Sequence, residues 1–250
     1  MILRLLLLFT FLIVGALADP AAKPDRPPVM LFVHGAWGGA WQFGKIDPLL
    51  RAQGFDVRRA TLTGLGERFH LADDELGLET HIEDIVNLIR FEDLRNIILV
   101  GHSYGGMVIS GVADRMPDRI ARLVYLDAFV PNDGDSVATL RTGEADLTPL
   151  AQDGFVAPWW VKPDRPYPKD VPHPLKTLTD KISLTNPAAR EIPATYILTV
   201  EAGQPADEDD FAPHAARARV RGWTVLTLEG DHNPHWRRPG ETAALLGTLR

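Results

Sequence analysis

The chain has 250 residues, which fits a single α/β domain with a sizeable core or such a domain with one insertion. Its formal net charge of −7 argues against a nucleic-acid partner, because such proteins meet phosphates with basic patches. The sequence contains no cysteine, so disulfides, a thiol nucleophile and thiolate metal sites are all excluded.

The first residues have the pattern of an export signal. Arg4 precedes an apolar run that starts at Leu5, and Ala16-Leu17-Ala18 supplies the small residues of a cleavage site. The run is short compared with the roughly 20 residues that cross a bilayer. We therefore expect a signal peptide at 1–18 that is cleaved near Ala18, followed by a linker at 19–28. The mature protein is then exported, periplasmic or secreted, with no stable membrane span. The alternative is an N-terminal segment that remains as an anchor.

Short apolar strands alternate with helices from residue 29 onwards. The predicted strands are Val29–Val33, Phe55–Ala60, Ile97–Val100, Arg122–Leu126, Thr195–Val200 and Thr224–Leu228. The predicted helices are Ile46–Gln53, Ile82–Phe91, Met107–Met116 and Thr242–Leu249. This alternation is typical of an α/β fold, with a mostly parallel sheet of about six strands and helices on both faces.

One long stretch breaks the alternation. Residues 131–193 are rich in Pro, Asp and Thr, and their aromatic side chains follow no clear period. Loops of this length inside a compact domain are usually functional when they are not disordered. We predict that this stretch is a lid, inserted into a domain that covers 29–250.

The segment Gly101-His102-Ser103-Tyr104-Gly105 fits the pattern G-x-S-x-G between a predicted strand and a predicted helix. Such a sharp turn exposes the serine hydroxyl, and the following helix directs its N-terminal N–H groups at the reaction centre. Ser103 is therefore predicted to be a nucleophile, and the backbone N–H of Tyr104 an oxyanion donor. A structural serine is the less favoured interpretation.

A second oxyanion donor should come from the loop after the first strand. His34-Gly35-Ala36-Trp37 lies there, and its glycine lets the backbone approach a ligand closely. We assign this donor to the Ala36 N–H, with the Trp37 N–H as the adjacent alternative. The alternative interpretation is that these residues form an ordinary glycine turn with no role in catalysis.

Two histidines compete for the role of general base in the loop after the last strand. His232 is nearer to the strand end and follows Asp231, so it is favoured over His235, which is expected in the pocket or behind the base. The other histidines have structural interpretations, and His214 is expected on a surface helix. If the acid lies between Ser103 and His232, the chain order is Ser, acid, His.

These motifs resemble the α/β-hydrolase superfamily, and within it the compact branch of plant methyl-ester esterases, hydroxynitrile lyases and bacterial esterases. The resemblance rests on His34–Trp37, Gly101–Gly106 and Asp231-His232, with support from "TLTGLGER" and "YLDAFVP". It implies an esterase-type triad that uses no metal and no organic cofactor.

Two positions depart from the lyases of that branch. Those lyases carry a lysine after the catalytic histidine and a threonine in the oxyanion loop, where this chain has Asn233 and Ala36. A lyase needs the positive charge to hold departing cyanide, so hydrolysis is favoured.

The acid of the triad has two candidates. In this branch it usually follows the strand predicted at Thr195–Val200, where the chain has Glu201. Other α/β hydrolases take it from the strand predicted at Arg122–Leu126, which Asp127 follows directly. Both ends lie at the same sheet edge. We favour Asp127 for its shorter and stiffer side chain, with Glu201 as the alternative.

The expected activity is a serine hydrolase acting on a carboxylic ester or lactone. Trp159 and Trp160 in the predicted lid, with Trp37 beside the oxyanion loop, indicate a pocket for a fairly bulky apolar small molecule, and a macrolide-type lactone is one candidate. The same aromatics could instead hold the lid down. A binding protein that retains this fold without turnover is the alternative class.

Overall fold

The structure is a computed structural model that describes residues 27–142 and 147–250; the predicted signal peptide and most of the predicted linker lie outside them. Six strands form one sheet in the order β2-β1-β3-β4-β8-β9, and every neighbouring pair is parallel. The strands are β1 (Val29–Val33), β2 (Asp56–Ala60), β3 (Ile97–His102), β4 (Ile120–Leu126), β8 (Ala194–Val200) and β9 (Thr224–Glu229). All six predicted strands are confirmed, with ends that differ by at most two residues.

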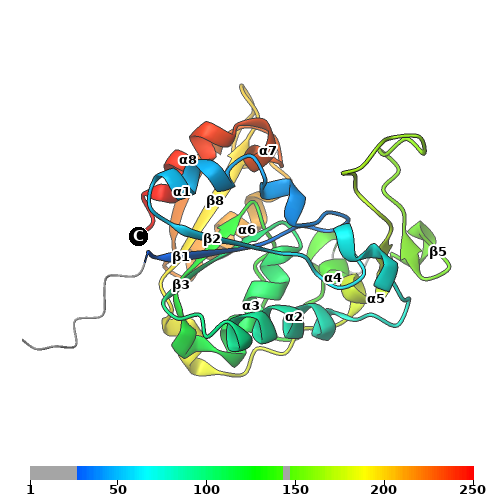
Figure 1. The fold of residues 1–250 in the computed structure, drawn as a ribbon, viewed down its shortest axis with the longest axis horizontal. Helices are drawn as coiled ribbons and strands as arrows, with labels where there is room; N and C mark the ends of the chain where they lie inside the picture. Colours follow the sequence, from blue (N-terminus) through cyan, green and yellow to red (C-terminus); the bar gives the residue numbers. More distant parts are fainter. Residues whose placement is uncertain (1–26, 143–146) are drawn as a thin grey trace, which may run out of the picture.

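Helices cover both faces of this sheet, as predicted (Figure 1). One face carries α1 (Asp47–Ala52) and α8 (Pro239–Gly247), and the other carries α2 (Leu78–Phe91), α3 (Gly105–Arg115) and α6 (Ala212–Val220). The remaining short helices of the main body are η1 (Ala40–Phe43), η2 (Gly66–Leu71), η3 (Pro117–Arg119) and α7 (Pro234–Arg237). Among the described residues, no helix has both the length and the apolar character needed to cross a membrane.

Alternating side chains of the buried strands supply the two cores. In β1, Leu31 and Val33 pack towards α2 and α3, whereas Met30 and Phe32 pack towards α1 and α8. Because both faces are covered, the strand is apolar at every position and shows no polar alternation. The apolar face of α2 is buried as its helical period predicts.

Helix α2 begins at Leu78, four residues before the predicted start. Asp180 explains the difference, because its Oδ2 accepts a hydrogen bond from the Leu78 N–H at 3.1 Å. A carboxylate at this end satisfies one of the unpaired helical N–H groups and complements the helix dipole. The cap comes from 102 positions along the chain, so local sequence gave no signal for it.

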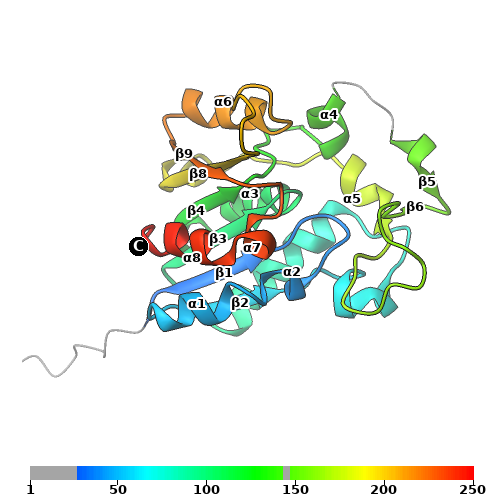
Figure 2. The ribbon, with the colours of Figure 1, turned by 90° about the horizontal axis from the view of Figure 1, so that it is seen from above.

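The segment between β4 and β8 has its own small elements. They are α4 (Val137–Thr142), η4 (Thr148–Leu150), β5 (Ala151–Gln152), β6 (Phe155–Val156), β7 (His173–Pro174), α5 (Leu175–Thr179) and η5 (Pro187–Glu191). The three short strands form an antiparallel sheet. This inserted segment extends beyond the carboxyl ends of the main strands (Figure 2). Ligands of open α/β sheets bind at that edge.

Candidate active site

Ser103 lies in the sharp turn between β3 and α3, with a left-handed φ of 52°. Neighbouring chain segments approach the turn so closely that a side chain would not fit at its glycines. A Cβ on Gly101 would lie 2.6 Å from the Gly105 carbonyl oxygen, and one on Gly105 would lie 2.5 Å from that of Val33. The G-x-S-x-G pattern is therefore a steric requirement of this turn.

The two predicted oxyanion donors come from different loops beside Ser103. Ala36 follows β1, Tyr104 precedes the first residue of α3, and both line the same cavity as Ser103. The Trp37 N–H, the alternative donor, is already used, because it donates to Nδ1 of His173 at 3.1 Å. Because the Trp37 N–H already has an acceptor, Ala36 is favoured over Trp37 as the second oxyanion donor. The Tyr104 side chain is buried, and its hydroxyl meets His81 Nδ1 at 2.8 Å.

Asp127 is the carboxylate that contacts His232. Its Oδ2 lies 2.6 Å from His232 Nδ1, and its Oδ1 accepts from the Thr199 N–H at 3.0 Å. The residue follows β4 directly, has a φ of 44° and is 1% exposed. Its own N–H donates to the Ile197 carbonyl of β8 at 2.8 Å, which continues the sheet bonding and fixes the turn.

Glu201, the alternative acid, follows β8 at the same edge but is exposed. It lines the cavity mouth and is not the carboxylate hydrogen-bonded to His232. Both candidates thus reach the predicted edge, and the buried aspartate is the one in contact with the imidazole.

His232 lies half-buried between two rings. Phe211 stacks on it with ring centroids 4.7 Å apart and an interplanar angle of 16°, and His102 packs at 4.7 Å. His102 Nε2 also donates to the His232 carbonyl at 2.7 Å. No hydrogen bond joins Ser103 to His232 among the described residues, although both line one cavity. Catalytic hydrogen bonds are often longer before substrate binds.

His235 lies behind this site and does not line the cavity. It is fully buried, with its ring 4.5 Å from that of His102 and 4.9 Å from that of Phe43. Burial, with a smaller contribution from the nearby His232, lowers the pKa of His235 to about 3. Of the two predicted places for His235, the pocket and a position behind the base, the structure shows the position behind the base.

His214 lies on a helix whose outer face is exposed, as predicted, but its own side chain is buried. His214 lies on α6 but is 4% exposed, because α6 packs against the chain that leaves β4. Its Nδ1 accepts from the Val130 N–H at 3.3 Å, and burial lowers its pKa to about 4. Helical periodicity alone did not indicate which face of α6 is covered.

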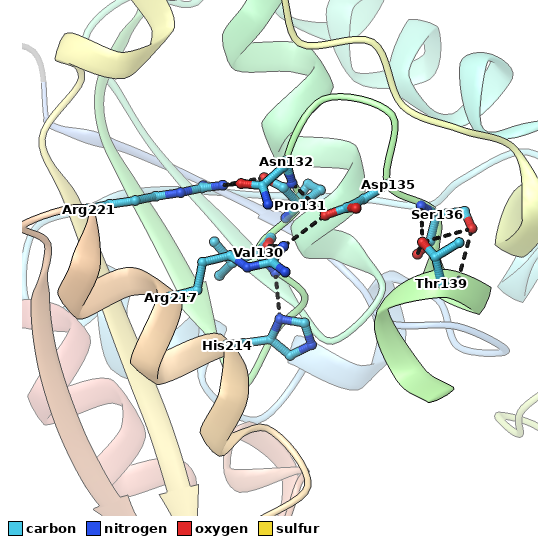
Figure 3. A network of polar contacts seen from close by, with 9 residues as sticks. All are labelled: Val130, Pro131, Asn132, Asp135, Ser136, Thr139, His214, Arg217 and Arg221. Atoms are coloured by element: carbon cyan, nitrogen blue, oxygen red, sulfur yellow. Dashed lines mark hydrogen bonds and ion pairs between the residues drawn. The ribbon is translucent and has the colours of Figure 1, made fainter. Parts of the chain in front are cut away.

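A polar network ties the same chain to α6 (Figure 3). Arg217 donates to the Val130 carbonyl and to Asp135 Oδ2, both at 2.8 Å, and Arg221 donates to Asn132 Oδ1 at 2.7 Å. These contacts lie directly after Asp127, so they hold the start of the inserted segment in place. This network could not be predicted from local sequence, since its partners are more than 80 positions apart.

A cavity of about 920 Å³ opens beside Ser103 and His232. The predicted pocket residues Trp37, Trp159 and Trp160 all line it, and their rings meet edge to face. Its remaining apolar wall includes Phe129, Val137, Leu140, Leu147, Leu150, Val156, Leu178 and Phe211. Trp159 is 71% exposed, so it forms part of the mouth.

Acidic side chains also line the cavity: Glu201, Glu208, Asp209, Asp210 and Asp231. Burial raises the pKa of Asp209, and the nearby Asp127 charge raises it further. The cavity lining thus has an apolar part and an acidic part, which we call the acidic edge. No cluster of metal-ligating side chains suitable for an ion occurs in the described part of the chain.

Comparison with known proteins places this fold and site in context. A family model described as the alpha/beta hydrolase family matches residues 30–245. The chain is 53% identical over 110 residues to a carbendazim hydrolyzing esterase of Nocardioides sp. (strain SG-4G), covering 44% of this chain and 46% of that protein. It is 33% identical over 121 residues to methylesterase 8 of Arabidopsis thaliana, covering 48% and 44%.

These two matches therefore span less than half the length of either relative. Over a longer range, the chain resembles the solved structure of an extracellular alpha/beta-hydrolase from a Paenibacillus species. That similarity has a TM-score of 0.68 at 25% identity and covers 89% of this chain and 98% of the other. The family match covers most of the sequence, and the chain belongs to the alpha/beta hydrolase family.

Proposed function

We propose that this protein is a serine hydrolase that cleaves carboxylic esters through an acyl-enzyme, with Ser103, His232 and Asp127 as its triad. The observation that carries the proposal is the 2.6 Å contact between buried Asp127 and His232 Nδ1, in the lining of the cavity that Ser103 also lines. The names of the relatives, an esterase and a methylesterase, support ester hydrolysis.

The reaction proceeds in two acyl transfers. Ser103 Oγ attacks the ester carbonyl while His232 Nε2 takes its proton, and Asp127 stabilises the imidazolium that forms. The N–H groups of Ala36 and Tyr104 bind the oxyanion, each contributing roughly 3 kcal/mol to the transition state. His232 then protonates the leaving alcohol and activates the water that releases the acid.

The substrate is a neutral ester with a bulky apolar part. Tryptophan and aliphatic side chains line the cavity, and its volume of about 920 Å³ accommodates a molecule of drug size. The acidic edge repels an anionic substrate and favours departure of the carboxylate product. The same size and apolar wall also suit a bulky lactone, such as a macrolide-type ring, which is the second candidate.

Labelling with a fluorophosphonate probe tests the proposal. We expect the wild-type protein to be labelled, and Ser103→Ala to lose labelling and turnover completely. Ser183→Ala is the matched control, because Ser183 is exposed and lies away from the cavity, and it should label like wild type. Absence of labelling in the wild type would contradict the proposal and favour a binding protein.

Mass spectrometry in the same experiment identifies the substrate class. An apolar methyl ester should yield its free acid and methanol with wild type, but not with Ser103→Ala. A macrocyclic lactone that gains the mass of one water would favour the second candidate, whereas an unchanged lactone mass would leave simple esters as substrates.

A further inference from the structure

Trp37 has an unusual backbone for so large a residue. Its φ is 64°, in the left-handed region that bulky side chains rarely occupy. It directly follows Ala36, whose N–H is the proposed oxyanion donor. Strained backbone at such a position persists only when surrounding contacts hold it there. Contacts from other parts of the chain are therefore needed to hold Trp37 in this conformation.

These contacts come from the inserted segment, which binds Trp37 at three points. The Trp37 N–H donates to His173 Nδ1 at 3.1 Å, and the indole Nε1–H donates to the Val156 carbonyl at 2.8 Å. The Val171 N–H donates to the Trp37 carbonyl at 2.9 Å. All three partners lie more than 110 residues along the chain, in β6, in β7 and just before β7.

The hydrogen bonds of His173 fix its tautomer. Nδ1 accepts from Trp37, so the ring proton is on Nε2, which donates to Thr177 Oγ1 at 2.6 Å. The Thr177 hydroxyl in turn donates to the Pro174 carbonyl at 2.9 Å. His173 is fully buried and packs against the ring of Tyr104 at 5.1 Å. An imidazolium has no acceptor for the Trp37 N–H, so only the neutral ring makes this contact.

We infer that His173 is a positioning residue, which holds the oxyanion loop by accepting the Trp37 N–H and leaves the Ala36 N–H as the donor to the reacting carbonyl. The inserted segment then does more than line the substrate cavity, because it preorganises the oxyanion hole. The inference rests on the proposed hydrolase function. Donors that are already in place before reaction stabilise the transition state most effectively.

Two variants of His173 separate its two hydrogen bonds. In His173→Asn the side-chain oxygen takes the place of Nδ1, so the acceptor for Trp37 is retained. In His173→Gln the amide reaches the position of Nε2, so the contact with Thr177 is retained and the acceptor for Trp37 is displaced. With p-nitrophenyl butyrate, we expect kcat of His173→Gln to fall about 10- to 100-fold, as for a misplaced oxyanion donor. His173→Asn should stay within about fivefold of wild type, and KM of both should change less than about threefold.

A trifluoromethyl ketone inhibitor reports on the oxyanion hole directly, because its serine adduct places an oxyanion there. Its Ki should rise in His173→Gln by about the same factor as kcat/KM falls. His70→Gln is the matched control, since His70 is exposed and lies outside the cavity lining, and it should behave as wild type. Melting temperatures of all variants identify any general loss of stability.

The outcomes distinguish the two proposals. If wild type neither labels nor turns over, the hydrolase function fails. If wild type is active but His173→Asn and His173→Gln have equal kcat, or both change only the melting temperature, the positioning role of His173 is wrong and the function stands. If His173→Gln does not fold, ¹⁵N-histidine NMR of wild type decides, because the inference requires an unprotonated Nδ1 and a protonated Nε2. A protonated Nδ1 would overturn it.

Discussion

Asp127 contacts two partners at once, and in the proposed triad its exchange for the amide should therefore impair the reaction. Oδ1 accepts from the Thr199 N–H and Oδ2 faces His232 Nδ1. In Asp127→Asn the oxygen stays with Thr199 and the NH₂ group faces Nδ1. The imidazole then adopts the tautomer with a proton on Nε2, which cannot accept the proton of Ser103. We expect kcat to fall about 10⁴-fold.

Glu201→Gln is the comparison variant, because it makes the same chemical change on an exposed carboxylate at the same sheet edge. Its kcat should remain within about threefold of wild type. Steady-state kinetics on one ester measures both variants. Near-full turnover by Asp127→Asn together with a large loss in Glu201→Gln would reverse the assignment of the acid.

The turn that carries the proposed nucleophile could be predicted from the sequence because its pattern is local. A strand, five residues and a helix are enough to single out Ser103. The choice between Asp127 and Glu201 depends on which carboxylate is buried against the neighbouring strand, and that is decided by a β4–β8 contact across 72 positions. His173 carries no local signal, since its partner Trp37 lies 136 positions away.

Helix α3 depends on close approach of its first turn to the chain after β4. A Cβ added to Gly106 would lie 2.1 Å from the Phe129 carbonyl oxygen, which is backbone and cannot rotate away. Gly106→Ala should therefore displace α3 or the chain after Asp127. We expect it to lower the free energy of unfolding by about 1–3 kcal/mol, as overpacked sites do, and to reduce activity. Urea denaturation measures the first effect.

Gly240 gives the matched control within a helix. It lies near the start of α8, and nothing is within 4 Å of its added Cβ. Gly240→Ala should leave stability unchanged or raise it by up to about 1 kcal/mol, because alanine favours the helix. Equal effects of the two substitutions would mean that close packing at Gly106 is unimportant.

The main elements could be predicted because each has a strong period or a long apolar run. Strands β1, β3, β4 and β8 are largely buried on both faces, the edge strands β2 and β9 are partly exposed, and α2 buries one regular stripe. The inserted segment offered no such pattern. Strands β5, β6 and β7 have two residues each, too short to show a period, and they form through their pairing and their contacts with Trp37. That this segment acts as a lid stays a prediction.

Six of the eight histidines are buried: His34, His81, His102, His173, His214 and His235. Burial is the main cause that lowers the pKa of each, to about 4 for His34 and His81 and well below the ordinary value for His102 and His173. The folded protein therefore holds these rings neutral at pH values where the unfolded chain protonates them. The folded state therefore loses stability relative to the unfolded chain as the pH decreases.

This imbalance predicts a steep loss of stability in acid. Below the unfolded histidine pKa of about 6.5, the unfolded chain binds more protons than the folded one, so the free energy of unfolding falls as pH falls. A histidine stops adding to this loss once its folded form is also protonated, which occurs below a pKa of about 4 for His34, His81 and His214. Each buried histidine contributes up to about 1.4 kcal/mol per pH unit in that window. Urea denaturation at pH 8, 7, 6 and 5.5 should show a small decrease in stability between the first two values and a sharp decrease at the last two.

The contribution of His214 to this pH dependence can be removed while the hydrogen bond to the Val130 N–H is kept. In His214→Asn the side-chain oxygen replaces Nδ1 as acceptor for the Val130 N–H, while the titrating ring is gone. The slope of unfolding free energy against pH near 5.5 should decrease by about 1.4 kcal/mol per unit, which is one proton. His70→Asn removes an exposed ring and should leave the slope unchanged. Equal slopes in wild type and His214→Asn would mean that His214 is protonated in the folded protein, and that the acid sensitivity arises from other groups.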